Sequence, residues 1–146
     1  MTSPYTPPPP DLEPPGGKAS IGMDANLASM LCYVTMICCG LGIILSLVFF
    51  LLEKTSRLLR FHAMQALLYG GVWIVVGIAF RILSMLAEIA LGDALGPLVF
   101  FGWLAARLLV GLVLLAFLIL AAIKAYQGQY YKLPILGNIA WNIVNK

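Results

Sequence analysis

Charged residues are scarce in this chain and unevenly placed. They make up 10% of its 146 residues, whereas an ordinary soluble domain contains roughly a quarter. The sequence has one histidine and six acidic residues, and it contains no Ser-His-Asp set, no HExxH or CxxC motif and no glycine-rich phosphate loop. Such a chain has little means of general acid–base catalysis, so we expect no enzyme, no catalytic residue, no cofactor and no nucleic-acid partner.

The cysteines do not suggest a metal site either. Cys32, Cys38 and Cys39 all lie in one apolar run, and no histidine or acidic residue stands near them in that run. Metal sites in proteins usually combine cysteine with histidine or with further cysteines at defined spacings. We therefore expect no metal ligand and interpret these cysteines as small apolar side chains that fill space.

The first residues lack the features of a cleavable signal peptide. A basic start and an apolar stretch are missing, and the string TPPPPDLEPPGG stands there instead. This composition predicts a disordered, extended, proline-rich tail over residues 1–23. The alternative is a proline-rich ligand that captures a partner protein.

Long apolar runs dominate the rest of the chain, whose mean hydropathy is +0.97. Residues 27–52 carry no charge, a second uncharged run covers 63–80, and an apolar region at 94–123 is interrupted only by Arg107. A helix of about 20 apolar residues crosses the hydrocarbon core of a bilayer. The sequence therefore predicts an all-α integral membrane helical bundle with three transmembrane helices, formed as one domain by residues 24–146.

Basic residues indicate how the three spans are oriented. They cluster after the first span and after the third, so the positive-inside rule predicts a plasma-membrane protein with an outer N-terminus and a cytoplasmic C-terminus. Around the elbow that follows the first span, we expect the basic face to meet anionic lipid headgroups, while Leu58 and Phe61 dip into the acyl boundary. The basic residues concerned are Lys54, Arg57, Arg60, Lys124, Lys132 and Lys146.

Three charged residues lie within or beside the second and third spans, namely Arg81, Glu88 and Arg107. If these spans cover 63–91 and 98–123, both arginines lie about 14 Å below the outer end, at 1.5 Å per residue. They would then form an intramembrane polar cluster with Glu88, and such a cluster would mark a polar pathway.

Shorter spans at 63–82 and 104–124 give a different interpretation. Both arginines then snorkel to the outer headgroups, and residues 83–103 lie on the outer surface or re-enter the membrane shallowly. We favour these short spans, because charge deep in a bilayer is costly and short spans need none.

Small residues predict where helices approach one another closely. They recur every seven positions along the second span, and the third span carries a pair four residues apart. We expect these positions to pack against helices of this chain, of a second copy or of another membrane protein. The positions are Ala63, Gly70, Gly77 and Ser84 in the second span and Gly102 and Ala106 in the third.

The C-terminal residues combine basic and aromatic side chains, as segments at a membrane surface do. Gly128 and Pro134 interrupt the helix there, and Ile139 and Ile143 share one face of a last short helix. The sequence thus predicts an interfacial C-terminal segment. Its aromatic residues are Tyr126, Tyr130, Tyr131 and Trp141.

Three strings of residues now resemble a known family. NLASMLCY opens the first span, LLEKTSRLLRFHAMQALL forms the elbow, and IKAYQGQYYKLPILGNIA follows the last span. Together they resemble a widespread family of small bacterial and archaeal membrane proteins of unknown function. That family is described as similar to the Tic-type channel component of the chloroplast inner-envelope import machinery. The resemblance covers about residues 24–141 and implies a multi-helix membrane protein without implying an activity.

The positions that match the family motifs have no established role, and we interpret them as anchors of the cytoplasmic ends of the bundle. The elbow and the C-terminal motif would lie at one membrane face, where Glu53 could pair with Lys124 or Lys132. His62 shares a helix face with Gln65, and we expect it to be solvated or hydrogen-bonded rather than a proton relay. The matching positions are Glu53, Arg57, Arg60, Phe61, His62, Gln65, Lys124, Tyr126, Gln127, Gly128, Tyr131, Lys132 and Pro134.

The sequence leaves three functions open. The leading hypothesis is a non-enzymatic scaffold or translocon-like subunit that acts through helix packing. A small-solute or ion conduit lined by Arg81, Glu88 and Arg107 is the alternative, and an adaptor using the proline-rich tail is a further one. We expect the bilayer, anionic headgroups and either a second copy or other membrane proteins as partners.

Overall fold

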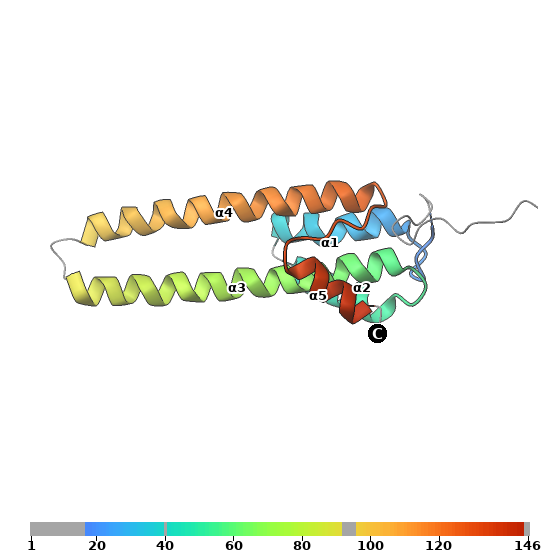
Figure 1. The fold of residues 1–146 in the computed structure, drawn as a ribbon, viewed down its shortest axis with the longest axis horizontal. Helices are drawn as coiled ribbons and strands as arrows, with labels where there is room; N and C mark the ends of the chain where they lie inside the picture. The colour runs from blue at the N-terminus through green and yellow to red at the C-terminus, as the bar shows by residue number, and fades with distance from the viewer. Residues whose placement is uncertain (1–16, 40, 92–95, 145–146) are drawn as a thin grey trace, which may run out of the picture.

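The computed structural model describes residues 17–39, 41–91 and 96–144, and these form five helices (Figure 1). Outside the helices, an isolated bridge pairs Lys18 with Asp24. The predicted all-α helical bundle is confirmed, while the proline-rich part of the tail, residues 1–16, lies outside the described residues. The helices are α1 (Ala25–Cys39), α2 (Gly42–Leu52), α3 (Arg57–Leu91), α4 (Gly96–Tyr126) and α5 (Leu136–Val144).

Two of these helices form a long antiparallel hairpin. α3 has 35 residues and α4 has 31, so at 1.5 Å per residue they are about 52 Å and 46 Å long. Among the described residues these two helices are long and apolar enough to cross a membrane. Residues 83–91 and 96–103 continue the two helices. The choice between spans at 63–91 and 98–123 and shorter spans at 63–82 and 104–124 stays a prediction.

Residues 27–52 form two helices and not the one long span that their composition predicts. α1 ends at Cys39, α2 begins at Gly42, and α2 returns alongside α1. A Cβ atom at Gly42 would lie 2.6 Å from the backbone nitrogen of Met36, so only glycine permits this close return of the chain. The predicted three spans are therefore corrected to two long helices and a shorter helical hairpin.

The N-terminal segment lies at the same end of the bundle as the elbow. The backbone N–H of Ser20 donates to both carboxylate oxygens of Glu53, at 3.1 and 2.9 Å, and its hydroxyl donates to the carbonyl of Leu52. An outer N-terminus with a cytoplasmic elbow would separate these residues by a membrane. That predicted arrangement is wrong, because returning α2 brings the chain back to the end where α1 began.

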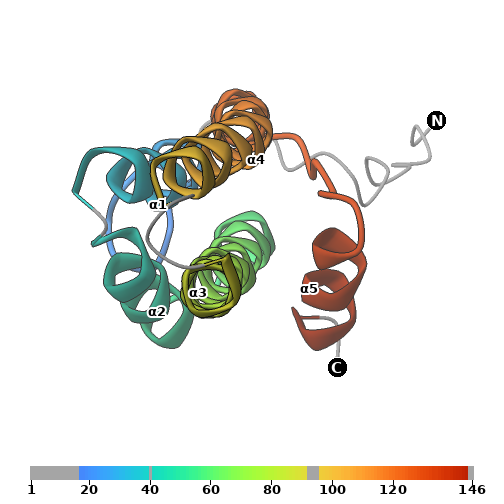
Figure 2. The same ribbon diagram turned by 90° about the vertical axis from the view of Figure 1, so that its left-hand side faces the viewer.

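Burial divides the molecule into two parts. We call the end where α1, α2 and α5 surround the hairpin the hub, which includes residues 57–70 of α3 and 118–126 of α4. We call residues 71–91 of α3 and 96–117 of α4 the arm. No described side chain of the arm is buried. Figure 2 shows α1 and α2 on one side of α3 and α5 on the other.

Candidate functional site

The elbow motif and the C-terminal motif meet in the hub through Gln65. Its side-chain nitrogen donates to the Tyr33 hydroxyl and to the carbonyl of Tyr131, both at 3.1 Å. Its side-chain oxygen accepts the backbone N–H of Leu133 at 3.3 Å. Gln65 is fully buried, so this one amide joins α1, α3 and the segment between α4 and α5.

His62 extends the same network, and its partners determine its tautomer. Its Nε2 lies 3.0 Å from the carbonyl of Gln129, and its Nδ1 lies 3.0 Å from the Tyr33 hydroxyl. A carbonyl only accepts, so Nε2 carries the hydrogen, and the Tyr33 hydroxyl donates to Nδ1 of the neutral ring. His62 is fully buried, and all its polar atoms are used for structure rather than for solvation.

Aromatic rings cover this network. Phe61 is fully buried and makes edge-to-face contacts with Tyr130 and Trp141, with ring centroids 5.5 and 5.8 Å apart. The ammonium nitrogen of Lys132 lies 4.2 Å from the centroid of Trp141, a cation–π contact. Phe61 and Leu58 are thus buried inside the protein, and the prediction that they dip into lipid is wrong.

Two glycines of the C-terminal motif are required by the backbone. Gly128 has φ +73° and caps α4: its N–H donates to Ala125 and that of Gln129 donates to Lys124, a Schellman motif. At Gly137 a Cβ atom would lie 2.5 Å from Cα of Lys132. The motif therefore encodes a tight path that places the carbonyls of Gln129 and Tyr131 against α3.

Glu53 is the second polar centre of the hub and is only 1% exposed. Besides Ser20, its carboxylate accepts the backbone N–H groups of Thr55 and Ser56 and the Thr55 hydroxyl, at 2.8–2.9 Å. Burial acts to raise the pKa of Glu53, but these hydrogen bonds outweigh it and lower the pKa to about 2. The carboxylate thus closes the elbow against the N-terminal segment, and not through the pairing with Lys124 or Lys132 that we predicted.

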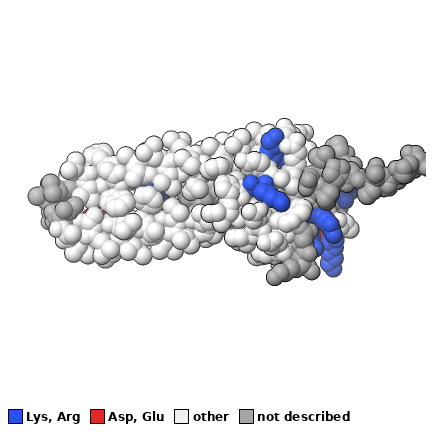
Figure 3. Space-filling view, in the orientation of Figure 1, with Lys and Arg blue, Asp and Glu red and all other residues white. Residues whose placement is uncertain are grey.

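The basic residues predicted to meet headgroups gather at the hub, where most of the blue atoms in Figure 3 lie; Lys146 lies outside the described residues. Lys54 and Arg57 are exposed beside the elbow, and Lys132 is exposed between α4 and α5. Arg60 is half-buried, with its guanidinium carbon 5.5 Å from the centroid of the Phe50 ring. Lys124 is half-buried in the last turn of α4.

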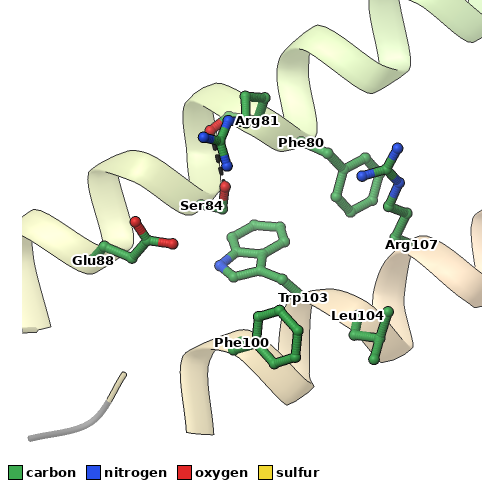
Figure 4. A pocket seen from close by; sticks show the side chains of 8 residues that line it. All are labelled: Phe80, Arg81, Ser84, Glu88, Phe100, Trp103, Leu104 and Arg107. Carbon is green, nitrogen blue, oxygen red and sulfur yellow. Dashed lines mark hydrogen bonds between the residues drawn. The ribbon is translucent and has the colours of Figure 1, made fainter. Parts of the chain in front are cut away.

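The three charged residues of the predicted polar cluster line one pocket of about 160 Å³ in the arm. Arg81 and Glu88 reach it from α3, and Arg107 reaches it from α4. Figure 4 shows Glu88 and Trp103 pointing toward each other across the space between the helices. The other residues lining the pocket are Phe80, Ser84, Phe100 and Leu104.

The predicted packing positions fall in two different environments. Ala63 is fully buried in the hub, and a Cβ atom at Gly70 would lie 2.5 Å from Ile43 of α2. In the arm, by contrast, a Cβ atom at Gly77 or Gly102 would meet no atom within 4 Å. Ser84 is half-buried, with its hydroxyl donating to the carbonyl of Arg81, and Ala106 is half-buried too.

Sequence reasoning missed three residues of the hub, namely Tyr33, Ser20 and Gly137. Tyr33 had a usable signal, since it is a polar-tipped ring in a run without charge, and such a ring seeks a partner when buried. Ser20 had none, because its role depends on the return of α2. The spacing of Gly137 from Pro134 belongs to the motif, but the need for glycine follows from the path of Lys132.

Fold and site together define a multi-helix membrane protein whose two sequence motifs form one polar, hydrogen-bonded hub. Residues 24–141 match the magnetosome magnetite crystal formation protein family, and the chain belongs to that family.

Curated relatives support the same class. The chain is 37% identical over 128 residues to a UPF0132 membrane protein of Methanocaldococcus jannaschii, covering 85% of this chain and 92% of the relative. A second one from that organism is 32% identical, covering 83% and 71%, and one from Archaeoglobus fulgidus is 33% identical, covering 81% and 93%. No solved structure matches the chain. The predicted membrane class is confirmed.

Proposed function

We propose that this chain is a non-enzymatic membrane scaffold or translocon-like subunit that binds other membrane helices through its arm. The observation that carries the proposal is the arm itself, where a Cβ atom at Gly77 or Gly102 of the packing seam would meet no atom within 4 Å. A Cβ atom at Gly77 would meet nothing, although Gly77 continues the stripe on which Gly70 contacts α2. In a bilayer, close approach at small residues is a main source of helix association.

The simplest partner is the arm of a second copy. Two helices and a short hairpin enclose no pore for a polypeptide, so a translocon-like role requires several chains side by side. The translocon-like role is suggested by the resemblance of the sequence motifs to a Tic-type import component, and by that resemblance alone. The family takes its name from magnetite crystal formation, and the described residues contain no group of three or more His, Cys, Asp or Glu side chains placed to hold a metal ion.

We place the hub on the cytoplasmic side of the plasma membrane. Lys18, Lys54, Arg57, Lys124 and Lys132 all belong to the hub end, and basic residues favour the cytoplasmic side. The exposed residues among them, Lys18, Lys54, Arg57 and Lys132, would meet anionic headgroups, at about 1 kcal/mol per residue near the surface. In this orientation Ser20 and the C-terminal helix lie on the same side. Thiol labelling of single cysteines at Ser20 and Asn142 in intact cells tests it, and labelling of either before the cells are opened would contradict it.

The test of the scaffold compares two glycines of α3. Gly77→Leu fills the unpartnered seam, whereas Gly71→Leu adds the same side chain on another face, since six residues advance a helix by 600°, or 240° around its axis. Neither new Cβ atom meets anything within the chain. We expect Gly77→Leu to weaken self-association, measured by energy transfer between labelled copies in bilayers, and Gly71→Leu to leave it unchanged. Equal association of both variants and wild type would refute packing through the seam.

A conduit is the second candidate, favoured by the pocket that Arg81, Glu88 and Arg107 line. Charged side chains inside a bilayer commonly mark solute or ion pathways. If the arm forms a conduit, Arg81→Leu and Arg107→Leu change solute flux in proteoliposomes, while Arg57→Leu at the hub does not. Unchanged flux in both arm variants would exclude the conduit and leave the scaffold standing.

A further inference from the structure

The cross-section of this protein differs between the two halves of the membrane. Around the hub, α1 and α2 pack against one side of α3 and α5 packs against another (Figures 1 and 2). Along the arm only α3 and α4 remain, and none of their described side chains is buried. Because both parts belong to one membrane protein, the shape determines how much area the chain occupies in each leaflet.

For either register of the spans, the buried part of the two long helices lies within one leaflet. Whether the spans are 63–91 and 98–123 or 63–82 and 104–124, their boundary on the hub side lies at residue 63 in α3 and near Lys124 in α4. The last buried residue of α3 is Gly70, 7 positions inside that boundary, and the first of α4 is Leu118, 6 positions inside. At 1.5 Å per residue these depths are about 10 Å and 9 Å, less than half of a hydrocarbon core of about 30 Å.

The tip of the α1–α2 hairpin ends near the middle of the bilayer. An apolar pocket of about 550 Å³ opens there, lined by Met36 and Ile37 of α1, Ile43 of α2 and Ile74 of α3, among others. Ile74 is 11 residues from the boundary at residue 63, or about 16 Å. Beyond this level the described chain consists of α3 and α4 alone.

Helix α5 adds further area to the same leaflet. Its Gly137 and Ala140 are buried toward α3, whereas Ile139 and Ile143 are each 42% exposed. Exposed isoleucines beside Trp141 and Lys132 are typical of a helix that lies in the interface with its apolar face among acyl chains. Such helices expand the leaflet into which they insert.

We infer that this chain is a wedge that concentrates on membranes whose hub-side leaflet is convex. With a diameter of about 10 Å per helix, α1 and α2 alone add roughly 160 Å² to that leaflet and nothing to the other. In a curved bilayer the convex leaflet has the larger area per patch, so a molecule that is wide there and narrow opposite fits without stretching either leaflet. The binding partner is thus a lipid surface of one sign of curvature, whichever side of the cell the hub faces.

The test uses both orientations of the full chain in the same kind of membrane. Cysteines are replaced by alanine, Asn142→Cys supplies one exposed label site on α5, and the protein is reconstituted in giant vesicles from which narrow tubes are pulled outward. A membrane-impermeant dye marks molecules whose hub faces outward. In a second sample the outward-facing cysteines are first blocked with an unlabelled impermeant reagent, and a membrane-permeant dye then marks the molecules whose hub faces inward.

We expect the density of hub-outward molecules, normalised to a lipid dye, to be higher on the tube than on the vesicle. Hub-inward molecules must show a ratio below one. Equal ratios for the two orientations would overturn the wedge, because every other property of the protein is identical between them.

A paired variant tests the part assigned to α5. Ile139→Ser with Ile143→Ser removes the exposed apolar side chains, and we expect the hub-outward ratio to fall toward one. Asn138→Ser on the exposed polar side is the control and should leave the ratio unchanged. If the double variant sorts as wild type does, α5 is not part of the wedge. Self-association is measured separately by energy transfer, so loss of the scaffold and loss of the wedge remain distinguishable.

Discussion

Acid should weaken this protein through the carboxylate of Glu53. The pKa of this group is lowered from 4.5 to about 2, because five hydrogen bonds to the charged form outweigh the effect of burial. At about 1.4 kcal/mol per unit of pKa, this difference corresponds to about 3 kcal/mol of unfolding free energy. Because the folded pKa lies below the unfolded one, this stability is present above about pH 4.5 and is lost as the pH falls toward 2.

The measurement is the free energy of unfolding in detergent between pH 7 and pH 3. By linkage, about 2 kcal/mol of the contribution of Glu53 is lost at pH 3. In Glu53→Gln the amide cannot accept at both positions, so we expect a loss of about 2–3 kcal/mol at pH 7. The curves for wild type and variant should then converge in acid. Parallel curves, with the same pH dependence in both proteins, would show that this carboxylate is not the acid-sensitive contact.

Two further substitutions test the hub. Gln65→Met keeps the side-chain volume but leaves the N–H of Leu133 and the other partners of Gln65 without their hydrogen bonds. We expect it to lower the free energy of unfolding by about 3 kcal/mol, measured by thermal or denaturant unfolding. Tyr33→Phe should lower it by about 1 kcal/mol. A loss below that of Tyr33→Phe would contradict the central place of Gln65. Gly137→Ala forces a Cβ atom into the Lys132 backbone. We expect it to lower the free energy of unfolding by several kcal/mol, as other overpacked core substitutions do. Gly71→Ala, where the new Cβ atom has free space, is the control and should unfold as wild type does.

The elbow shows how far sequence reasoning reaches. The motif positions His62 and Gln65 were expected to share a helix face and to lie at the same end of the bundle as the C-terminal motif, and the structure brings them together. Helical spacing suffices for the shared face, and the placement at one end needs only the lengths of the two long helices. Their actual partners could not be predicted, because Tyr33 and residues 129–133 lie between 29 and 68 positions away in the chain.

The class of this protein, its long apolar helices and the end of the bundle where basic charge gathers can all be predicted from the amino-acid sequence. Each of these follows from local composition, since hydropathy and helical period are averages over neighbouring residues. The folding of residues 27–52 as two helices, and the contact of Ser20 with Glu53 that follows from it, become visible in the three-dimensional structure. The hydropathy of residues 27–52 is compatible both with one long helix and with a helical hairpin. The choice between them depends on the close approach of the backbone at Gly42 and of Ile43 to Gly70, which are contacts between segments.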